Sequence, residues 1–562
     1  METDPSAPDP ARPADAWRLL TPFVVALAIF VILATSLALT KAPWCDEGWF
    51  ANPAYNLAFH GQMGTNVLEP SGHFLNAYLK GIQERTYYVV PIHMVALAGW
   101  FKIFGFSLLA MRAYSMVWGA LGLLFIFYIL YRLFPDPRVA QLGTLMTAID
   151  FIYLWNSADG RMESSANALA LASMAAYLYL RERNFRNAVL VSQVLGAAAV
   201  FTHPNALLVL LALPVLVWRF DLRQVRFRHL FLAAAPYLIL GALWSLYIAQ
   251  SPAEFAAQFL ANAAGPNSMR RWTGIIQPWL AFWMEARRYL NTYVSKSGLW
   301  SGVMNPWMIL VPIFYVASLV WFTWNRRRFP APVRAFLACT LTVVLAVTFL
   351  NGFKAPNYMM YLVPFYNASL AFWLLHRWRF GLDSKIAAAV VGIAFVSLQI
   401  AASVQHVRAD EYHRDYLPLI ARLKKEQTAG KTILGTAAIG FGMGFQGFAD
   451  DWRLGQYSRL DPDIIVVDRS YRAFTKWYED DEPSVFSHIV STLTSNYRLT
   501  SSAGTFWIFE RVRPGDAAPP FIDIRYLGMQ RKGKKADYLF KQLLAQNGCD
   551  SLKEPFSRAA SF

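Results

Sequence analysis

Long apolar runs separated by short polar loops fill most of the first 400 or so residues. A run of about 20 apolar residues crosses a bilayer as a helix, with a lower limit of roughly 17. The pattern predicts eleven transmembrane helices, although the pair 188-203 and 205-218 is short and is divided by a turn at His203-Pro204-Asn205, expected at the interface. The first run is expected to stay as an anchor, because no small-residue cleavage site follows it. The eleven runs lie near residues 21-40, 111-131, 139-156, 164-180, 188-203, 205-218, 229-249, 306-325, 335-350, 357-376 and 386-404.

Five of the loops between these runs are rich in basic residues. The positive-inside rule places such loops in the cytoplasm. A path with a cytoplasmic N-terminus places all five there and puts the segment after the last span outside. The basic residues of these loops are Arg132, Arg138, Arg181, Arg183, Arg186, Arg219, Arg223, Arg226, Arg228, Arg326, Arg327, Arg328, Arg334, Arg377, Arg379 and Lys385.

Residues 87-105 form a further apolar stretch that contains Pro91, His93 and Lys102. A span at this point would invert every later loop and break the charge rule five times. The stretch is therefore predicted to be an interfacial or re-entrant helix within a first outer loop at 41-110. A twelfth span is the alternative.

The pattern changes near residue 405, where apolar runs shorten and charged residues, turns and alternating segments begin. An amphipathic helix is predicted at 413-427, short strands at 432-434, 464-467 and 506-509, and a flexible turn at 440-444. The predicted fold class is thus an all-α polytopic membrane domain at 21-404, preceded by an arm at 1-20 and followed by an extracytoplasmic α/β domain at 405-562. The glycine-rich turn lacks the basic residue and the Ser or Thr of a phosphate-binding loop.

Composition supports a membrane protein. The chain has 562 residues, of which 56% are hydrophobic and only 16% charged. The net charge of +16 would suggest nucleic acid in a soluble protein, but here topology explains the basic loops, so no nucleic-acid partner is expected. Three cysteines have no metal-ligand spacing and cannot build a disulfide framework.

Polar residues on the predicted outer side gather in a few segments at the ends of the spans. Acidic side chains at the edge of the hydrocarbon layer are costly unless they are paired, bound to a metal or placed in a water-filled cavity. Each residue alone is also explained as marking the end of a span, but their convergence on one side predicts a polar site. The members are Asp46, Glu47, Glu84, Arg85, Asp159, Glu163, Arg270, Arg271, Lys354, Tyr358 and Tyr361.

The same segments carry a resemblance. The chain resembles GT-C glycosyltransferases related to protein O-mannosyltransferases and to lipid A aminoarabinose transferases over roughly residues 20-375, and the order of the motifs is more specific than any one of them. The motifs are Asp-Glu followed by Phe-Ala-Asn-Pro-Ala-Tyr-Asn-Leu-Ala-Phe-His-Gly, then Glu-Arg-Thr-Tyr-Tyr-Val-Val-Pro, Phe-Lys-Ile-Phe-Gly-Phe-Ser, Ala-Met-Arg-Ala-Tyr-Ser, Gly-Arg-Met-Glu-Ser and Lys-Ala-Pro-Asn-Tyr-Met-Met-Tyr-Leu-Val-Pro-Phe-Tyr.

The resemblance implies an inverting transfer of a sugar from a polyprenyl phosphate to a lipid, glycan or protein acceptor at the outer face of a bacterial cytoplasmic membrane. It implies Asp46 as the catalytic base and Glu163 as a second acid. If Asp46 is not the base, Glu47 and Glu163 are the next candidates. A base at this point takes the proton from the acceptor as it attacks the anomeric carbon. The lipid phosphate leaves, so cations or a metal must stabilise its charge.

The chain departs from these relatives at three points. Arg85 stands where the lipid A transferases have Lys. Asn262 lies near the position of the histidine that partners the metal-binding carboxylate in those enzymes. Trp49 stands where they often have a basic side chain. Glu84 is therefore a tentative metal ligand only, and a divalent metal is an open possibility. Trp49 leaves the identity of the donor open.

Positive charge on the outer side has no topological reason, which suggests that Lys354, with Arg270 or Arg271 and Arg85, binds the donor phosphate. Tyr358 and Tyr361 are expected at the same mouth, and Asp159 among the substrate-binding residues. Two other functions fit the pattern: a transporter or flippase of lipid-linked sugars, and a non-catalytic relative. The absence of an internal repeat in the sequence favours an enzyme over a transporter. Neither the sugar nor the acceptor can be named from the sequence.

Overall fold

The computed structural model describes residues 13–72, 79–260, 274–294, 306–513 and 535–546. Helices lie at all eleven positions predicted to cross the membrane. The bundle consists of α1 (Pro13–Thr40), α4 (Leu108–Leu133), α5 (Pro137–Ile149), α6 (Phe151–Ser157), α7 (Glu163–Leu180), α8 (Phe185–Thr202), α9 (Ala206–Leu210), α10 (Ala212–Phe220), α11 (Phe227–Ile248), α16 (Leu310–Trp324), α17 (Ala331–Phe349), α18 (Val363–Arg377) and α19 (Leu382–Ala409).

Seven helical segments of the described chain are long and apolar enough to cross a membrane. The other four predicted spans are helical but interrupted, short or polar, so the number of crossings stays a prediction. The seven segments are Leu20–Thr40, Leu108–Leu133, Phe185–Thr202, Phe227–Ile248, Pro306–Trp324, Ala331–Phe349 and Leu382–Thr428.

One interruption has a clear cause in the sequence. The run 139-156 is broken between α5 and α6 by Asp150, which is completely buried. Its carboxylate caps α6 by accepting hydrogen bonds from the backbone N–H groups of Ile152, at 3.0 Å, and Tyr153, at 3.1 Å. The side chains of Gln399 and Tyr315 also donate to it. A buried carboxylate with this many donors has an architectural explanation.

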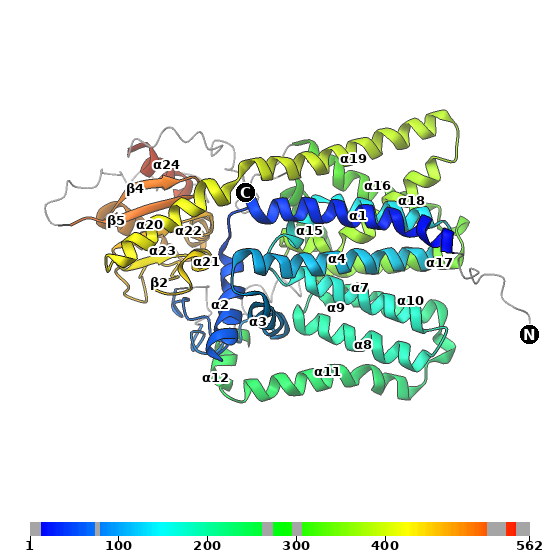
Figure 1. Ribbon diagram of the computed structural model, residues 1–562, viewed down its shortest axis with the longest axis horizontal. Coiled ribbons are helices and arrows are strands. Elements are labelled where there is room, and N and C mark those ends of the chain that lie inside the picture. Colours follow the sequence, from blue (N-terminus) through cyan, green and yellow to red (C-terminus); the bar gives the residue numbers. More distant parts are fainter. Residues whose placement is uncertain (1–12, 73–78, 261–273, 295–305, 514–534, 547–562) are drawn as a thin grey trace, which may run out of the picture.

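The arginine-rich loops lie together at one end of the bundle, opposite the sheet (Figure 1). Ion pairs link them: Arg132 contacts Glu182 at 2.7 Å, and Arg181 contacts Asp221 at 2.7 Å. A further pair at 2.6 Å joins Arg379 to Asp136. The structure thus places these loops on one side of the bundle, as predicted. Their location in the cytoplasm remains a prediction.

Short helices lie at the opposite end of the bundle, between its helix ends and the sheet (Figure 1). The first outer loop contributes α2 (Cys45–His60) and α3 (Ile92–Phe104). At about 1.5 Å per residue, the 13 residues of α3 reach about 20 Å, well short of the hydrocarbon thickness of about 30 Å. In Figure 1, α3 is seen nearly end-on, whereas α4 lies along the bundle. Helices α12 (Pro252–Phe255) and α15 (Pro278–Tyr293) lie near the same end.

The C-terminal part folds around a five-stranded sheet with strand order β2-β1-β3-β5-β4. Strand β1 pairs in parallel with β2 and β3, whereas β3 with β5 and β5 with β4 are antiparallel. We call this part the sheet domain. Its elements are α20 (Leu417–Thr428), β1 (Ile433–Gly435), α21 (Gly440–Met443), β2 (Phe448–Ala449), β3 (Ile464–Val467), α22 (Arg469–Asp481), α23 (Pro483–Ser491), β4 (Tyr497–Ala503), β5 (Phe506–Arg511) and α24 (Lys535–Gln546).

The predicted helix and strands of this domain are confirmed, but the predicted flexible turn at 440-444 is wrong. Residues Gly440–Met443 form the short helix α21, which ends at Gly444 in the left-handed conformation. A Cβ on Gly442 would lie 2.5 Å from the Ile420 side chain. These glycines therefore serve close packing rather than flexibility.

The buried side chains form separate hydrophobic clusters. One fills the helix bundle, and a second includes residues of the first outer loop together with residues of the sheet domain, such as Trp49, Leu97, Trp452 and Trp507. The first outer loop and the sheet domain therefore share one core, and α2 is held in it.

Candidate active site

Asp46 and Glu47 occupy the first turn of α2, where the helix dipole favours negative charge. The two adjacent carboxylates face different surroundings. Asp46 has 23% of its side chain exposed, whereas that of Glu47 has none. Only Asp46 is therefore open to a reactant in this arrangement.

Glu47 is saturated by protein donors. Arg112 forms a two-pronged ion pair with it, each contact at 2.8 Å. The backbone N–H groups of Gly160, at 3.1 Å, and Trp44, at 3.3 Å, also donate to the carboxylate. Burial alone would raise the pKa of Glu47, but Arg112 and the ammonium of Lys41 outweigh it and hold the pKa below its usual value. This environment argues for an architectural role of Glu47 and against a role as the base.

Arg161 forms ion pairs with two of the candidate carboxylates, Asp46 and Glu163. Its guanidinium forms an ion pair with Asp46 through one nitrogen, and its Nε donates to the carboxylate of Glu163 at 3.0 Å. Arg161 is 8% exposed and Glu163 is completely buried. The sequence places Arg161 in the correct segment, but nothing in the pattern of residues identifies it as the bridge between Asp46 and Glu163.

Asp159 belongs to a second charged group, which it forms with Lys41 and Trp44. Trp44 donates its indole N–H to Asp159 at 2.8 Å, and the ammonium of Lys41 lies 3.5 Å from the same carboxylate. Burial raises the pKa of Asp159 above its usual value, and the nearby Lys41 opposes that effect. Asp159 thus lies within the charged cluster, and its role in substrate binding stays a prediction.

The buried end of the site brings histidine and tyrosine rings to Glu163. The ring of His203 lies 5.4 Å from that of Tyr358 and 6.2 Å from that of Tyr361. His93 is 1% exposed, and neither of its ring nitrogens makes a hydrogen bond within the described residues. Burial lowers the pKa of His93 to about 4, although the charge of Glu163 opposes this effect, so His93 is neutral at physiological pH. The sequence signal for His93 is weak, since one histidine in an apolar helix is usually a packing residue.

Lys354 has a different environment from the predicted one. Its ammonium donates to the backbone carbonyl groups of Val347, at 2.9 Å, and Thr348, at 2.6 Å, and lies 3.0 Å from the Glu285 carboxylate. The two carbonyl groups use two of the three donors of the ammonium, and Glu285 supplies the countercharge as an ion pair. Lys354 therefore caps the end of α17, and the structure gives no support for its prediction as the phosphate ligand.

The remaining predicted ligands are less enclosed or lie outside the described residues. Arg85 lies 3.6 Å from Glu254 and 3.7 Å from Glu84, whose side chain is 67% exposed. No group of three or more metal-ligating side chains occurs among the described residues, including those around Glu84. Arg270 and Arg271 lie outside the described residues and stay predictions.

The sheet domain holds α2 through close contacts just after Asp46. A Cβ on Gly48 would lie 2.3 Å from the backbone carbonyl group of Ala437, so only glycine fits. Trp49 stacks on Trp452, with ring centroids 4.7 Å apart, and donates its indole N–H to Asp450 at 3.0 Å. The structure therefore explains why an aromatic residue, rather than a basic one, occupies position 49.

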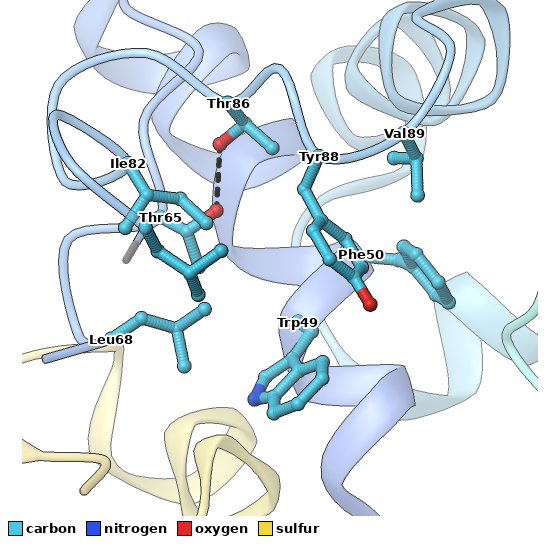
Figure 2. A pocket seen from close by; sticks show the side chains of 9 residues that line it. Trp49, Phe50, Thr65, Leu68, Ile82, Thr86, Tyr88 and Val89 are labelled. Atoms are coloured by element: carbon cyan, nitrogen blue, oxygen red, sulfur yellow. Dashed lines mark hydrogen bonds between the residues drawn. The ribbon is translucent and has the colours of Figure 1, made fainter. Parts of the chain in front are cut away.

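A small and mainly apolar pocket lies on this part of the first outer loop. Figure 2 shows Trp49 and Phe50 on α2 together with Tyr88, Leu68 and other side chains of the loop that line the pocket. A hydrogen bond of 2.7 Å between the Thr65 and Thr86 hydroxyl groups holds two segments of the loop together. The loop that carries Asp46 is thus internally cross-linked as well as docked on the sheet domain.

Comparison with solved structures identifies this architecture. The fold matches ArnT from Cupriavidus metallidurans bound to undecaprenyl phosphate with a TM-score of 0.52 and 12% identity, covering 88% of this chain and 98% of that one. It also matches the oligosaccharyltransferase AglB from Archaeoglobus fulgidus in complex with an inhibitory peptide and a dolichol-phosphate, with a TM-score of 0.53 and 14% identity over 90% of this chain and 75% of that one. The chain has the GT-C fold.

Sequence relatives agree with the GT-C fold. The chain is 26% identical over 310 residues to the undecaprenyl phosphate-alpha-4-amino-4-deoxy-L-arabinose arabinosyl transferases of Pseudomonas aeruginosa strain UCBPP-PA14 and Pseudomonas paraeruginosa strain DSM 24068 / PA7. The alignment covers 51% of this chain and 50% of each relative, so the chain spans about half the length of these curated relatives. No protein-family model matches the chain. The predicted resemblance to GT-C glycosyltransferases is thus confirmed at the level of fold.

Proposed function

We propose that this protein is an integral membrane glycosyltransferase that moves a sugar from a polyprenyl phosphate to an acceptor on the side of the membrane where the sheet domain lies. The observation that carries the proposal is the partly exposed Asp46, held by Arg161 at the junction of the bundle and the sheet domain. The relatives named for undecaprenyl-phosphate sugar transfer, and the fold match to ArnT bound to undecaprenyl phosphate, support this donor class. The positive-inside rule assigns the arginine-rich end to the cytoplasm of a bacterial inner membrane and the site to the outer face.

Asp46 is the catalytic base in this proposal. Its carboxylate takes the proton of the acceptor hydroxyl or amine while the acceptor atom forms a bond to the anomeric carbon. The bond from that carbon to the phosphate oxygen breaks on the opposite face, and the phosphate leaves with the electron pair. The sugar therefore changes its anomeric configuration.

Arg161 has two tasks in this scheme. Its pairing with Asp46 orients the carboxylate, and its contacts with Glu163 fix the guanidinium. A rearrangement of the Arg161 pair toward the leaving phosphate would stabilise the developing negative charge. Glu163 then acts as a positioning residue rather than as a second base.

The experiment that tests the proposal uses the purified full chain in lipid nanodiscs. Radiolabelled undecaprenyl-phosphate 4-amino-4-deoxy-L-arabinose serves as the donor and a total glycolipid extract of bacterial envelopes as the acceptor. We expect label to pass to the extract and the product to show the inverted anomer by NMR. Retention of configuration would eliminate Asp46 as a simple base, and donor binding without any transfer or hydrolysis would contradict an enzymatic function.

A further inference from the structure

A second pocket lies between the helix ends of the bundle and the sheet domain, and we call it the sheet-side pocket. The loop after α1, helix α6, the segment before α18 and the sheet domain all contribute side chains to it. Its empty volume is about 560 Å³, a value that includes the open solvent at its mouth. Its lining includes Lys41, Trp44, Trp155, Asn357, Glu411 and Arg469.

Lys41 is the unusual member of this lining. It is only 7% exposed, yet its ammonium makes no hydrogen bond to any residue that the structure describes. Its charge is balanced by Asp159 at 3.5 Å and by the ring of Trp155, whose centroid is 4.3 Å away. Buried donors are almost always hydrogen-bonded in folded proteins. An ammonium with three unused donors beside a pocket therefore suits a ligand that brings oxygen atoms to it.

The other side chains narrow the chemistry of that ligand. Arg469 and Glu411 form an ion pair at 2.6 Å, so they present fixed donors and acceptors with little net charge. Trp44 and Trp155 add flat apolar surface, and Asn357 offers both a donor and an acceptor. A sugar ring matches this combination, because its hydroxyl groups donate and accept at the edge while its C–H groups pack on indole rings. A polyprenyl chain would leave the polar groups unpaired.

The sheet-side pocket adjoins the candidate catalytic residues. Trp44 lines the pocket, and the Arg161 guanidinium lies 5.1 Å from its ring. A ligand in the pocket is thus separated by one side chain from the Arg161–Asp46 ion pair. Asn357 directly precedes Tyr358, whose ring contacts His203 near Glu163.

We propose that the sheet-side pocket binds a sugar ring of a substrate, with the sheet domain supplying part of the binding surface. The assignment as a substrate pocket rests on the proposed glycosyl transfer. The ring belongs either to the acceptor glycan or to the donor, and both present the same hydroxyl-rich chemistry.

Saturation-transfer NMR on the 562-residue chain in nanodiscs tests this proposal without requiring catalysis. The probes are methyl α-D-glucopyranoside, methyl β-D-galactopyranoside and methyl β-L-arabinopyranoside. The pocket variant is Glu411→Ala with Arg469→Ala, and the matched control removes a comparable ion pair of the sheet domain, Arg422 with Glu510 at 2.5 Å, by the same substitutions. We expect the pocket variant to bind at least one glycoside about tenfold more weakly or worse, because the ligand loses the hydrogen bonds offered by both side chains.

The outcomes separate this proposal from the proposed function. The sugar site is supported if saturation transfer is lost in the pocket variant and in Lys41→Met but is kept in the control. If Lys41→Met fails to fold, the comparison of the pocket variant with the control still decides. No binding of any glycoside by the wild type, or equal binding by all variants, overturns it. Hydrolysis of undecaprenyl-phosphate 4-amino-4-deoxy-L-arabinose then assigns the source: unchanged hydrolysis in the pocket variant indicates the acceptor sugar, and impaired hydrolysis the donor sugar. A wild type that binds glycosides but never turns over the donor contradicts the proposed function alone.

Discussion

The two neighbouring carboxylates at the start of α2 belong to different regions of the molecule. Glu47 faces the bundle, where Arg112 and two backbone N–H groups surround it, whereas Asp46 faces the junction with the sheet domain, with Arg161 as its cation and part of its surface open. The negative charge of Glu47 is enclosed by protein donors, whereas the carboxylate of Asp46 remains accessible to a reactant. An Asp-Glu pair in a sequence therefore does not define two equivalent catalytic acids.

The largest expected effect is on turnover, from Asp46→Asn. The amide keeps the shape of the side chain but cannot accept a proton, so sugar transfer should fall by about 10²–10⁴-fold. Thermal unfolding in nanodiscs should change little, because Asp46 is partly exposed and contributes one ion pair. Near-normal transfer by this variant would remove Asp46 from the role of base.

The next effect is on stability, from Glu47→Gln. This change leaves the completely buried Arg112 without its countercharge, which typically costs about 3–5 kcal/mol. We expect a large drop in the unfolding temperature and a low yield. The matched control is Glu182→Gln, which weakens the more exposed pairs with Arg132 and Arg181 and should cost less than about 1 kcal/mol for each pair. Equal stability of the two variants would mean that Glu47 is not the architectural member of the pair.

Lys354→Met extends the comparison of Asp46 and Glu47 to a third charged side chain of the predicted site. Because the ammonium is used by two carbonyl groups of α17 and by Glu285, its removal should lower the unfolding temperature. The apparent affinity for undecaprenyl phosphate, measured by equilibrium binding in nanodiscs, should stay within about twofold of the wild type. A selective loss of donor affinity with unchanged stability would instead restore the phosphate-binding role that the sequence suggested.

The last prediction concerns pH and the contact that holds α2 on the sheet domain. Burial raises the pKa of Asp450 to about 8, although hydrogen bonds from Trp49, Ala437 and Tyr471 oppose the shift. The folded protein then keeps a proton that the unfolded chain loses near pH 4. The stabilisation from Asp450 is therefore complete below about pH 4 and decreases as the pH rises to about 8. Asp450→Asn should flatten this part of the profile of unfolding temperature against pH, and an unchanged profile would contradict the assignment.

Much of the fold can be predicted from the sequence because the signals of membrane helices lie within short segments of the chain. A run of apolar residues and a basic loop are both readable without knowledge of partners, and helices lie at all eleven predicted positions. The exact extent of α5 and α6 is less predictable, because the break at Asp150 depends on donors from Tyr315 and Gln399, far away in the chain. The packing of Gly440–Met443 against α20 depends on tertiary contact in the same way.

The candidate site is predictable in its members but not in their relations. Asp46, Asp159 and Glu163 were expected to converge, and the structure brings them together through Lys41, Trp44 and Arg161. Which carboxylate is enclosed and which is open depends on Arg112, a single arginine in an apolar helix with no local signal of its partner. The same holds for His93, which becomes notable only through its burial and the proximity of Glu163.

The contact between Trp49 and Asp450 also sets an order of events during synthesis. The two residues are 401 positions apart, so at about 5–20 residues per second the ribosome needs roughly 20–80 seconds to supply the partner of Trp49. During that interval Gly48, Trp49 and Phe50 have no sheet domain to cover them. The surroundings of Asp46, which directly precedes this contact in α2, are therefore completed only after the sheet domain has been synthesised.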